Sequence, residues 1–275
     1  MTVLTHETLA TITWQGREVA IEYRWVNEPA DHDRCAARPL LVFLHEGLGS
    51  VAMWKDFPLA LCQACGLTGL VYSRPGYGQS TPRSADETWS NDFMHRQANE
   101  VLPALLDELG VTQPVVLFGH SDGGSIALLF AASHASRVAA TVVAAPHLFV
   151  EEVSVASIAQ ACLAYEAGAL KQRLAPYHQD TDSAFWGWCQ AWLSPSFRAW
   201  NIEAEVSAIT GPLLAIQGQK DEYGTMKQIH KIAQLAPQTR LLELADCGHS
   251  PHRDQAHLLI SNVTTFLEQH LGDLT

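Results

Sequence analysis

Residues 115–132, VVLFGHSDGGSIALLFAA, constrain the fold more than any other stretch of this chain. The apolar run Val115–Phe118 lies between Pro114 and a glycine, which is typical of a fully buried strand. The small apolar residues 126–132 are typical of a buried helix. The segment Gly119-His-Ser-Asp-Gly123 between them has the pattern G-x-S-x-G. A buried strand that passes directly into a buried helix indicates an α/β architecture.

The chemistry of serine explains this spacing. A hydroxyl is a weak nucleophile, so it must be presented to a base and to a substrate together. A sharp strand-to-helix turn does this by holding Ser121 in a strained backbone conformation. Side chains at positions 119 and 123 would collide in so tight a turn, so glycine is expected at both. An ordinary glycine-rich turn without catalysis could have the same pattern, so the interpretation depends on finding partners for Ser121.

The composition limits the class of protein. The chain has 275 residues, of which 47% are hydrophobic, and its formal charge is −12. This length and composition suit a single large α/β domain with a sizeable core. The negative charge argues against nucleic acid or an anionic membrane as a partner. Neither a signal peptide nor a membrane span is recognised, so a cytoplasmic location is expected.

Hydrophobic patterning predicts strands and helices along most of the chain. Residues 8–14 and 18–26 alternate in polarity around Gln15-Gly16 and predict an antiparallel hairpin. Short apolar runs bounded by turn residues predict six further strands at 39–44, 67–72, 115–118, 138–144, 212–217 and 239–244. Helices are expected at 54–66, 89–109, 126–132, 226–235 and 254–270.

Residues 148–207 lack this alternation and are rich in large aromatic side chains. We expect a helical lid inserted into a core that consists of residues 1–147 and 208–275. Some of the aromatic residues should line a cavity, and others should only hold the lid helices together. The candidates for the cavity wall are Trp186, Trp188 and Trp192.

Two further polar residues follow predicted strands. Asp221 comes shortly after strand 212–217, and His249 comes shortly after strand 239–244. Open α/β sheets bind ligands at the carboxyl ends of their strands, so Ser121, Asp221 and His249 are expected at one edge. The order Ser, Asp, His is also the order of one of the known serine triads. Asp246 and Glu222 are less well placed alternatives for the acid, and His252 is expected to have a structural role.

The loop His45-Glu-Gly-Leu-Gly-Ser50 follows strand 39–44. Such a glycine-rich loop can turn backbone N–H groups toward a ligand, although an ordinary turn would look the same. The N–H of Leu48, or else that of Gly47, is the candidate oxyanion donor.

The six cysteines are scattered, and no second pair accompanies Cys62-x-x-Cys65 at zinc spacing. We therefore expect buried free thiols and no metal site.

The chain resembles the α/β-hydrolase superfamily in these motifs. Residues 119–123 resemble the nucleophile elbow and residues 45–50 the oxyanion loop. Residues 73–80 resemble the turn after the fourth strand, 218–221 the acid turn, and 247–252 the histidine loop. Two positions depart from the pattern: Glu46 stands where many relatives have glycine, and Ser73 stands where many have aspartate.

The resemblance implies an eight-stranded, mostly parallel sheet with helices on both faces. It also implies a mechanism in which Ser121 attacks an acyl carbon, His249 transfers protons and Asp221 holds the histidine tautomer. The backbone N–H groups of Leu48 and Asp122 would bind the oxyanion. No metal or organic cofactor is implied.

The expected activity is hydrolysis of a small ester, thioester or lactone with an apolar or aromatic acyl group. The alternatives are hydrolysis of a carbon–carbon bond in a ring-cleavage dienoate, and a small-molecule binding protein that keeps the hydrolase fold. A dienoate would need a polar clamp in the lid, for which Arg173, Arg198 and Lys171 are candidates. The other expected pocket residues are Gly47, His120 and His147. A homodimer is possible.

Overall fold

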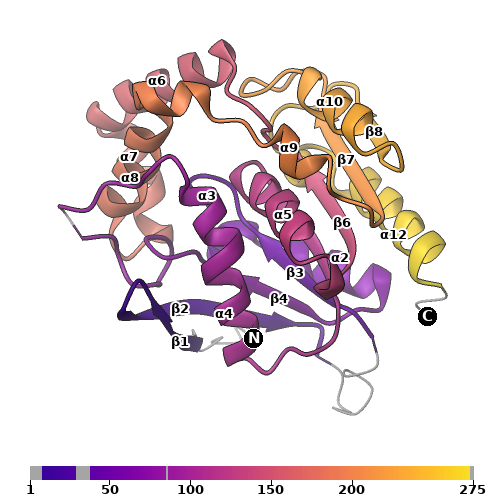
Figure 1. Cartoon of the computed structure of the whole chain (residues 1–275). Helices are drawn as coiled ribbons and strands as arrows, with labels where there is room; N and C mark the ends of the chain where they lie inside the picture. The colour runs from indigo at the N-terminus through magenta and orange to yellow at the C-terminus, as the bar shows by residue number, and fades with distance from the viewer. Residues whose placement is uncertain (1–7, 29–37, 85, 273–275) are drawn as a thin grey trace.

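The computed structural model describes residues 8–28, 38–84 and 86–272 of the chain (Figure 1). Its eight strands form one sheet in the order β1-β2-β4-β3-β5-β6-β7-β8. The strands are β1 (Thr8–Trp14), β2 (Arg17–Val26), β3 (Leu40–Leu44), β4 (Gly69–Tyr72), β5 (Val115–His120), β6 (Val138–Ala144), β7 (Leu213–Gly218) and β8 (Arg240–Leu244). The expected hairpin of β1 and β2 is antiparallel, β2 pairs antiparallel with β4, and the remaining pairs are parallel. The predicted fold class, a mostly parallel α/β-hydrolase sheet, is therefore confirmed.

The central strands are apolar on both faces because helices cover the sheet on both sides. Strand β5 shows this clearly. Val115 and Leu117 belong to one buried cluster, whereas Val116 and Phe118 belong to a second cluster on the opposite face. Helices α2 (Phe57–Cys65) and α12 (Ala256–Leu271) contribute to the second cluster. The first cluster is covered by α3 (Phe93–Arg96), α4 (Leu102–Glu108), α5 (Asp122–Ser133), α9 (Glu203–Val206) and α10 (Lys227–Leu235).

The long helix expected at residues 89–109 is interrupted. Helix α3 is followed by a π-type turn, η2 (Gln97–Val101), before α4 begins. Pro103 lies in the first turn of α4. Proline has no N–H to donate to the carbonyl four residues before it, so a regular α-helix cannot continue through this position. The apolar periodicity predicted the helical character of this segment but not the break.

The helices expected at 54–66 and 254–270 correspond to α2 and α12, and each is preceded by a separate short element. Turn η1 (Val51–Trp54) precedes α2, with Lys55 between them at φ 55°. A short helix, α11 (Pro251–Asp254), precedes α12. Helix α2 ends at Gly66, whose φ of 64° is the left-handed conformation expected for a glycine at a helix C-terminus.

The chain between β6 and β7 is helical where the structure describes it, apart from one isolated bridge between Phe149 and Asn201. We call residues 148–207 the helical segment (Figure 1). It consists of α6 (Glu152–Glu166), α7 (Ala169–Leu174), η4 (Ala175–Tyr177), α8 (Thr181–Leu193), η5 (Pro195–Ala199) and α9.

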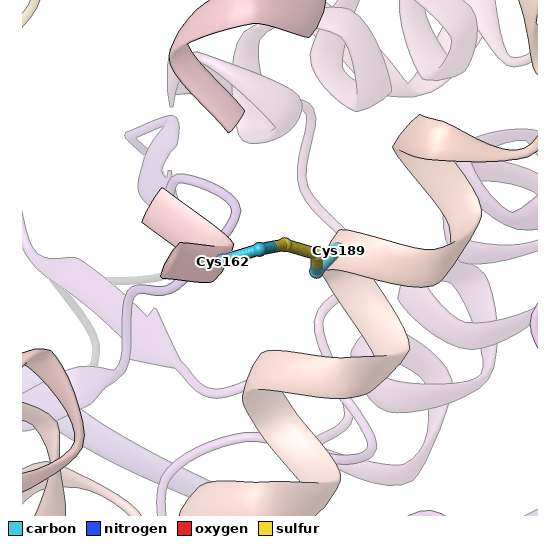
Figure 2. Close-up of a disulfide and its surroundings, with 2 residues drawn as sticks. All are labelled: Cys162 and Cys189. Atoms are coloured by element: carbon cyan, nitrogen blue, oxygen red, sulfur yellow. A yellow bond between two sulfur atoms is a disulfide. The ribbon is translucent and has the colours of Figure 1, made fainter. Parts of the chain in front are cut away.

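The expectation of free thiols is wrong for two cysteines. Cys162 of α6 and Cys189 of α8 form a disulfide that joins the two helices (Figure 2). The two residues are 27 positions apart, and their spacing gave no signal for the pair because the contact depends on how α6 and α8 pack. Cys62, Cys65 and Cys247 are free and buried, as expected. Since disulfides persist mainly in oxidising compartments, the pair gives no support to the expected cytoplasmic location.

Within the described ranges, no single helix is both long and apolar enough to cross a bilayer. Glu152–Glu166 and Ala169–Tyr177 reach that length and composition only together, and they are bent by 91°.

Candidate active site

Three strand ends bring the predicted catalytic residues to one edge of the sheet. Ser121 directly follows β5, Asp221 follows β7, and His249 follows β8. Strands β5 to β8 are consecutive neighbours and mutually parallel. Their carboxyl ends therefore lie at the same edge, and the turns after them meet.

Ser121 has a strained backbone, with φ 53° and ψ −121°. Such a conformation costs on the order of 1–3 kcal/mol in a residue other than glycine, so the surrounding structure must impose it. The two glycines make the turn possible: a Cβ atom on Gly119 would overlap the carbonyl of Gly123, and one on Gly123 would overlap the carbonyl of Leu44. The N–H of Ser121 donates to the carbonyl of Ala144 at 2.9 Å, which ties the turn to β6.

The side chains of Ser121, His249 and Asp221 form one chain of hydrogen bonds. Nε2 of His249 lies 2.9 Å from Oγ of Ser121, and its Nδ1 lies 2.8 Å from Oδ1 of Asp221. A carboxylate can only accept, so Nδ1–H donates to Asp221. This tautomer leaves Nε2 free to accept the proton of the serine hydroxyl. The arrangement has the geometry of a nucleophile, a base and a group that orients the base.

Asp221 is held by four donors and its side chain is almost completely buried. Oδ1 accepts from His249 and from the N–H groups of Tyr223 at 2.8 Å and Gly224 at 3.2 Å, while Oδ2 accepts from Nε2 of Gln217 at 2.7 Å. Burial by itself raises the pKa of Asp221, but the hydrogen bond and charge of His249 and the N–H of Tyr223 together hold it below its ordinary value. The carboxyl is therefore ionised at neutral pH.

A cavity of about 170 Å³ lies beside Ser121 and His249. Five of the six predicted pocket residues line it: Gly47, His120, His147, Trp188 and Trp192. Leu48 and Asp122, whose N–H groups are the candidate oxyanion donors, also line it. Asp122 is the first residue of α5, and an α-helix leaves its first N–H groups without partners inside the helix.

Trp186 is not part of this lining. Its ring packs edge-on against Tyr165 and Phe185 inside the helical segment. Trp188 and Trp192 are four residues apart and share one face of α8, whereas Trp186 is two residues before Trp188 and points to another side. The helical period alone could therefore have predicted that Trp186 lies on a different face of the helix from Trp188 and Trp192.

Five lining residues were not among the sequence candidates: Glu46, Ile158, Tyr223, Ser250 and Arg253. The ring of Tyr223 packs against His249, with the centroids 4.7 Å apart. Tyr223, Ser250 and Arg253 lie within four residues of Asp221 or His249 along the chain, so proximity to the predicted catalytic residues was a usable signal. Ile158 is in the helical segment and had no such signal.

Glu46 connects the loop after β3 to the histidine loop. One oxygen of its carboxylate lies 3.5 Å from Nδ1 of His120, and the other lies 3.4 Å from Nη2 of Arg253. His120 in turn places Nε2 2.7 Å from the backbone carbonyl of His249. Burial raises the pKa of Glu46, but the interactions with His120, His252 and Arg253 outweigh it and hold the pKa well below its ordinary value. A charged carboxylate thus helps to fix the distance between the two loops.

The side chain of Asp122 lies in the first turn of α5, where a negative charge is favourable. Its Oδ1 does accept from the indole Nε1–H of Trp192 at 3.1 Å. Burial is the larger effect, however, and raises the pKa of Asp122 from 3.8 to about 6. Between these two pH values the folded chain holds a proton that the unfolded chain releases, so rising pH lowers stability across that range.

The remaining candidates have other partners. Asp246 is exposed and pairs with Lys220 at 2.6 Å. Glu222 accepts from the backbone N–H of His249 at 3.2 Å, not from its ring. His252 packs on the ring of Trp54, in agreement with a structural role. Burial lowers the pKa of His147 to about 3, so His147 is a neutral wall of the pocket.

Ser73, the second departure from the superfamily pattern, donates to Glu22 at 2.6 Å and accepts from the N–H of Val51. In the described ranges, no group of three or more His, Cys, Asp or Glu residues is arranged to hold a metal ion.

Comparison with known proteins agrees with the fold. Residues 41–261 match the alpha/beta hydrolase family. The chain is 25% identical over 263 residues to the mouse (Mus musculus) sn-1-specific diacylglycerol lipase ABHD11, a match that covers 86% of this chain and 83% of the relative.

Two solved structures have similar folds. A thermophilic esterase from Thermogutta terrifontis superimposes with a TM-score of 0.74 at 18% identity and covers 97% of this chain and 100% of its own. The enol-lactonase from Burkholderia xenovorans superimposes with a TM-score of 0.73 at 22% identity and covers 94% and 99%.

Proposed function

Because the chain belongs to the alpha/beta hydrolase family, we propose that it is a serine hydrolase that cleaves a small ester, thioester or lactone through an acyl-enzyme on Ser121. The observation that carries this proposal is the hydrogen-bonded chain from Ser121 through His249 to Asp221. Ser121 also has a strained backbone at a strand-to-helix turn, and such strain is typical of functional sites.

In the proposed reaction, Ser121 Oγ attacks the acyl carbon while its proton passes to Nε2 of His249. The carbonyl oxygen becomes an oxyanion that accepts from the N–H groups of Leu48 and Asp122, each worth roughly 3–4 kcal/mol of transition-state stabilisation. The His249 imidazolium, held by Asp221, then protonates the leaving group. In the second half, His249 accepts a proton from water, the resulting hydroxide displaces Ser121 from the acyl carbon, and the proton returns to the serine.

The size of the cavity supports a small acyl group. Its volume of about 170 Å³ is below the roughly 300–1,000 Å³ of typical ligand sites. Trp188 and Trp192 form an apolar wall from the helical segment, which we therefore propose to be a lid. This wall favours an apolar or aromatic acyl group.

The lid cations argue against a ring-cleavage dienoate as substrate. Arg198 pairs with Glu152, and Lys171 pairs with Asp182 at 2.7 Å. Arg173 lines a different cavity. None of these three residues lines the cavity beside Ser121, so the clamp that a dienoate carboxylate would need is not supplied from the lid. Ester-type chemistry is for this reason the function that we propose.

The test is steady-state hydrolysis of p-nitrophenyl esters of increasing chain length. We expect fast turnover of acetate and butyrate esters and its loss in Ser121→Ala. Ser136→Ala, an exposed serine outside the cavity, is the matched control and should keep wild-type activity.

Mass spectrometry of the rapidly quenched enzyme should show one acyl group on the peptide that contains Ser121. Binding of the esters without turnover by the wild type would indicate the binding-protein alternative. Turnover that survives in Ser121→Ala would remove the serine mechanism.

A further inference from the structure

A second, larger cavity of about 840 Å³ lies at the edge of the helical segment. Its walls come from η1 and α2 on one side, α7 and η4 on another, and α11 and α12 on a third. This volume is within the range of typical small-molecule sites, unlike that of the cavity beside Ser121. The protein therefore provides ligand-sized space outside the proposed catalytic pocket.

The floor of the larger cavity is apolar. It is formed by aliphatic and aromatic side chains from both the core and the helical segment: Met53, Phe57, Ala60, Leu170, Leu174 and Ile260. A hydrocarbon chain of a ligand that packs on this floor would remove apolar surface of both the protein and the ligand from water. The favourable free energy is roughly 25 cal/mol per Å² of buried apolar area.

The rim carries an excess of positive charge. Lys55, Arg173 and Arg253 line the cavity with only one carboxylate, Asp56. The whole chain has 29 acidic and 17 basic side chains, so this local excess opposes its net charge. It makes the rim attractive to an anion.

These cations are available to a ligand. Lys55 Nζ donates to the hydroxyl of Tyr177 at 2.9 Å, a contact that joins the turn between η1 and α2 to η4. Arg253 has a contact of 3.4 Å with Glu46. Within the described part of the chain, Arg173 has no carboxylate partner, and its side chain is exposed.

The two cavities are neighbours. Arg253 lines both of them. Glu46, the ion-pair partner of Arg253, lines the smaller cavity. His252 lines the larger cavity, and its ring centroid lies 4.8 Å from that of His120, which lines the smaller cavity. The two cavities therefore adjoin at the exposed side chain of Arg253.

We propose that the larger cavity binds the remote part of the substrate, an aliphatic chain that ends in an anionic group such as a carboxylate. This inference rests on the proposed function for the position of the scissile carbonyl. The chain would lie on the apolar floor, and the anionic end would pair with Arg173 and Lys55. The substrate would then be a monoester of an aliphatic dicarboxylic acid: the smaller cavity would hold only the atoms around the scissile carbonyl, and the rest of the acyl chain would run into the larger cavity and end in the charged group.

The first experiment compares p-nitrophenyl hydrogen suberate with its uncharged methyl ester, using p-nitrophenyl acetate as a substrate that does not reach the larger cavity. We expect a kcat/KM at least about tenfold higher for the charged ester. Arg173→Gln should lower this preference about fivefold, the upper size of an exposed ion pair, and leave acetate hydrolysis unchanged. Lys171→Gln, a cation on the same helix that does not line the cavity, should keep the preference.

A second pair of variants tests the cavity itself. Ala60→Trp places a large ring in the apolar floor and should reduce kcat/KM for the suberate ester about tenfold or more. Ala64→Trp, one turn further along α2 and equally exposed, does not line the cavity and should have no effect. Equal kcat/KM values for charged and uncharged esters, or equal effects of the two tryptophans, would overturn the proposal.

Direct binding separates this proposal from the catalytic one. In Ser121→Ala, isothermal titration with decanoate below its micelle concentration should show binding that Ala60→Trp abolishes, and decan-1-ol should bind at least about fivefold more weakly. If acetate hydrolysis is absent but decanoate binds in this way, the proposed reaction fails while the anion site stands. If acetate is hydrolysed and decanoate does not bind, the anion site fails alone.

Discussion

Replacing Asp221 by asparagine tests the proposed division of roles most directly. All four groups around this carboxylate are donors: the His249 ring, two backbone N–H groups and the Gln217 amide. An asparagine has only one acceptor atom, so its NH2 must point at a donor in either orientation.

The two orientations have different consequences. If the NH2 takes the place of Oδ1, it faces Nδ1 of His249 and favours the tautomer with the proton on Nε2. That histidine cannot accept the proton of Ser121, and the N–H groups of Tyr223 and Gly224 lose their acceptor. If the NH2 takes the place of Oδ2, it faces Nε2 of Gln217, which is also committed to the carbonyl of Gly224 at 3.1 Å.

The expected loss in kcat for Asp221→Asn is roughly 10⁴-fold, by analogy with other triads in which the wrong tautomer is trapped. This corresponds to about 5 kcal/mol of lost transition-state stabilisation. The stability should fall by about 2–6 kcal/mol, because the N–H groups of Tyr223 and Gly224 both lose their acceptor when the NH2 takes the place of Oδ1, and each buried donor without a partner costs roughly 1–3 kcal/mol.

The assay is p-nitrophenyl acetate hydrolysis, with thermal unfolding and near-UV circular dichroism to show that the variant is folded. Asp246→Asn is the matched control, because Asp246 is a nearby carboxylate in the left-handed conformation that asparagine tolerates. It should keep wild-type kcat. An Asp221→Asn enzyme within tenfold of wild type would refute the reasoning and assign the acid to another carboxylate.

Three further predictions concern stability. Asp122→Asn removes a buried acid with a pKa of about 6. The free energy of unfolding of the variant, relative to that of wild type, should therefore rise by up to about 3 kcal/mol between pH 4 and pH 7. Denaturant unfolding of both proteins at both pH values measures this, and a difference between variant and wild type that does not change with pH would contradict it. Replacing Cys162 and Cys189 together by serine opens a loop of 27 residues and should lower the free energy of unfolding by about 3–4 kcal/mol. The midpoint of denaturant unfolding should be lower than that of wild type under non-reducing conditions only. Gly123→Ala forces a methyl group against the carbonyl of Leu44 and should destabilise the fold by more than about 3 kcal/mol. A thermal melting curve equal to that of wild type would contradict this and show that the turn can relax.

Much of this protein was predictable because the relevant signals are local. The apolar runs that end at Leu44, Phe118 and Gln217 are short and bounded by turn residues, and each is a strand in the structure. Their polar successors had to meet at one edge of a parallel sheet. The candidate site followed from that one topological rule, applied to Ser121, Asp221 and His249, which span 128 positions of the chain.

Other features depend on contacts between distant parts of the chain. The pairing of Cys162 with Cys189 depends on the packing of α6 against α8, which neither sequence segment specifies alone. The raised pKa of Asp122 depends on burial by distant parts of the chain, which outweighs the opposing effect of a hydrogen bond from Trp192, 70 residues away. The break at residues 97–101 was visible as Pro103 in the sequence, but apolar periodicity outweighed it in the prediction.

The amino-acid sequence by itself determined the order of strands and helices and the three residues of the hydrogen-bonded chain, because strand boundaries and turn residues are encoded within a few positions. Only the tertiary structure decided the second cavity and its positive rim. Lys55 lies between η1 and α2, Arg173 lies in α7 and Arg253 lies in α11. The three side chains line one cavity because the helical segment packs beside α2 and α12. Such proximity is a property of packing in three dimensions, and no pattern along the chain expresses it.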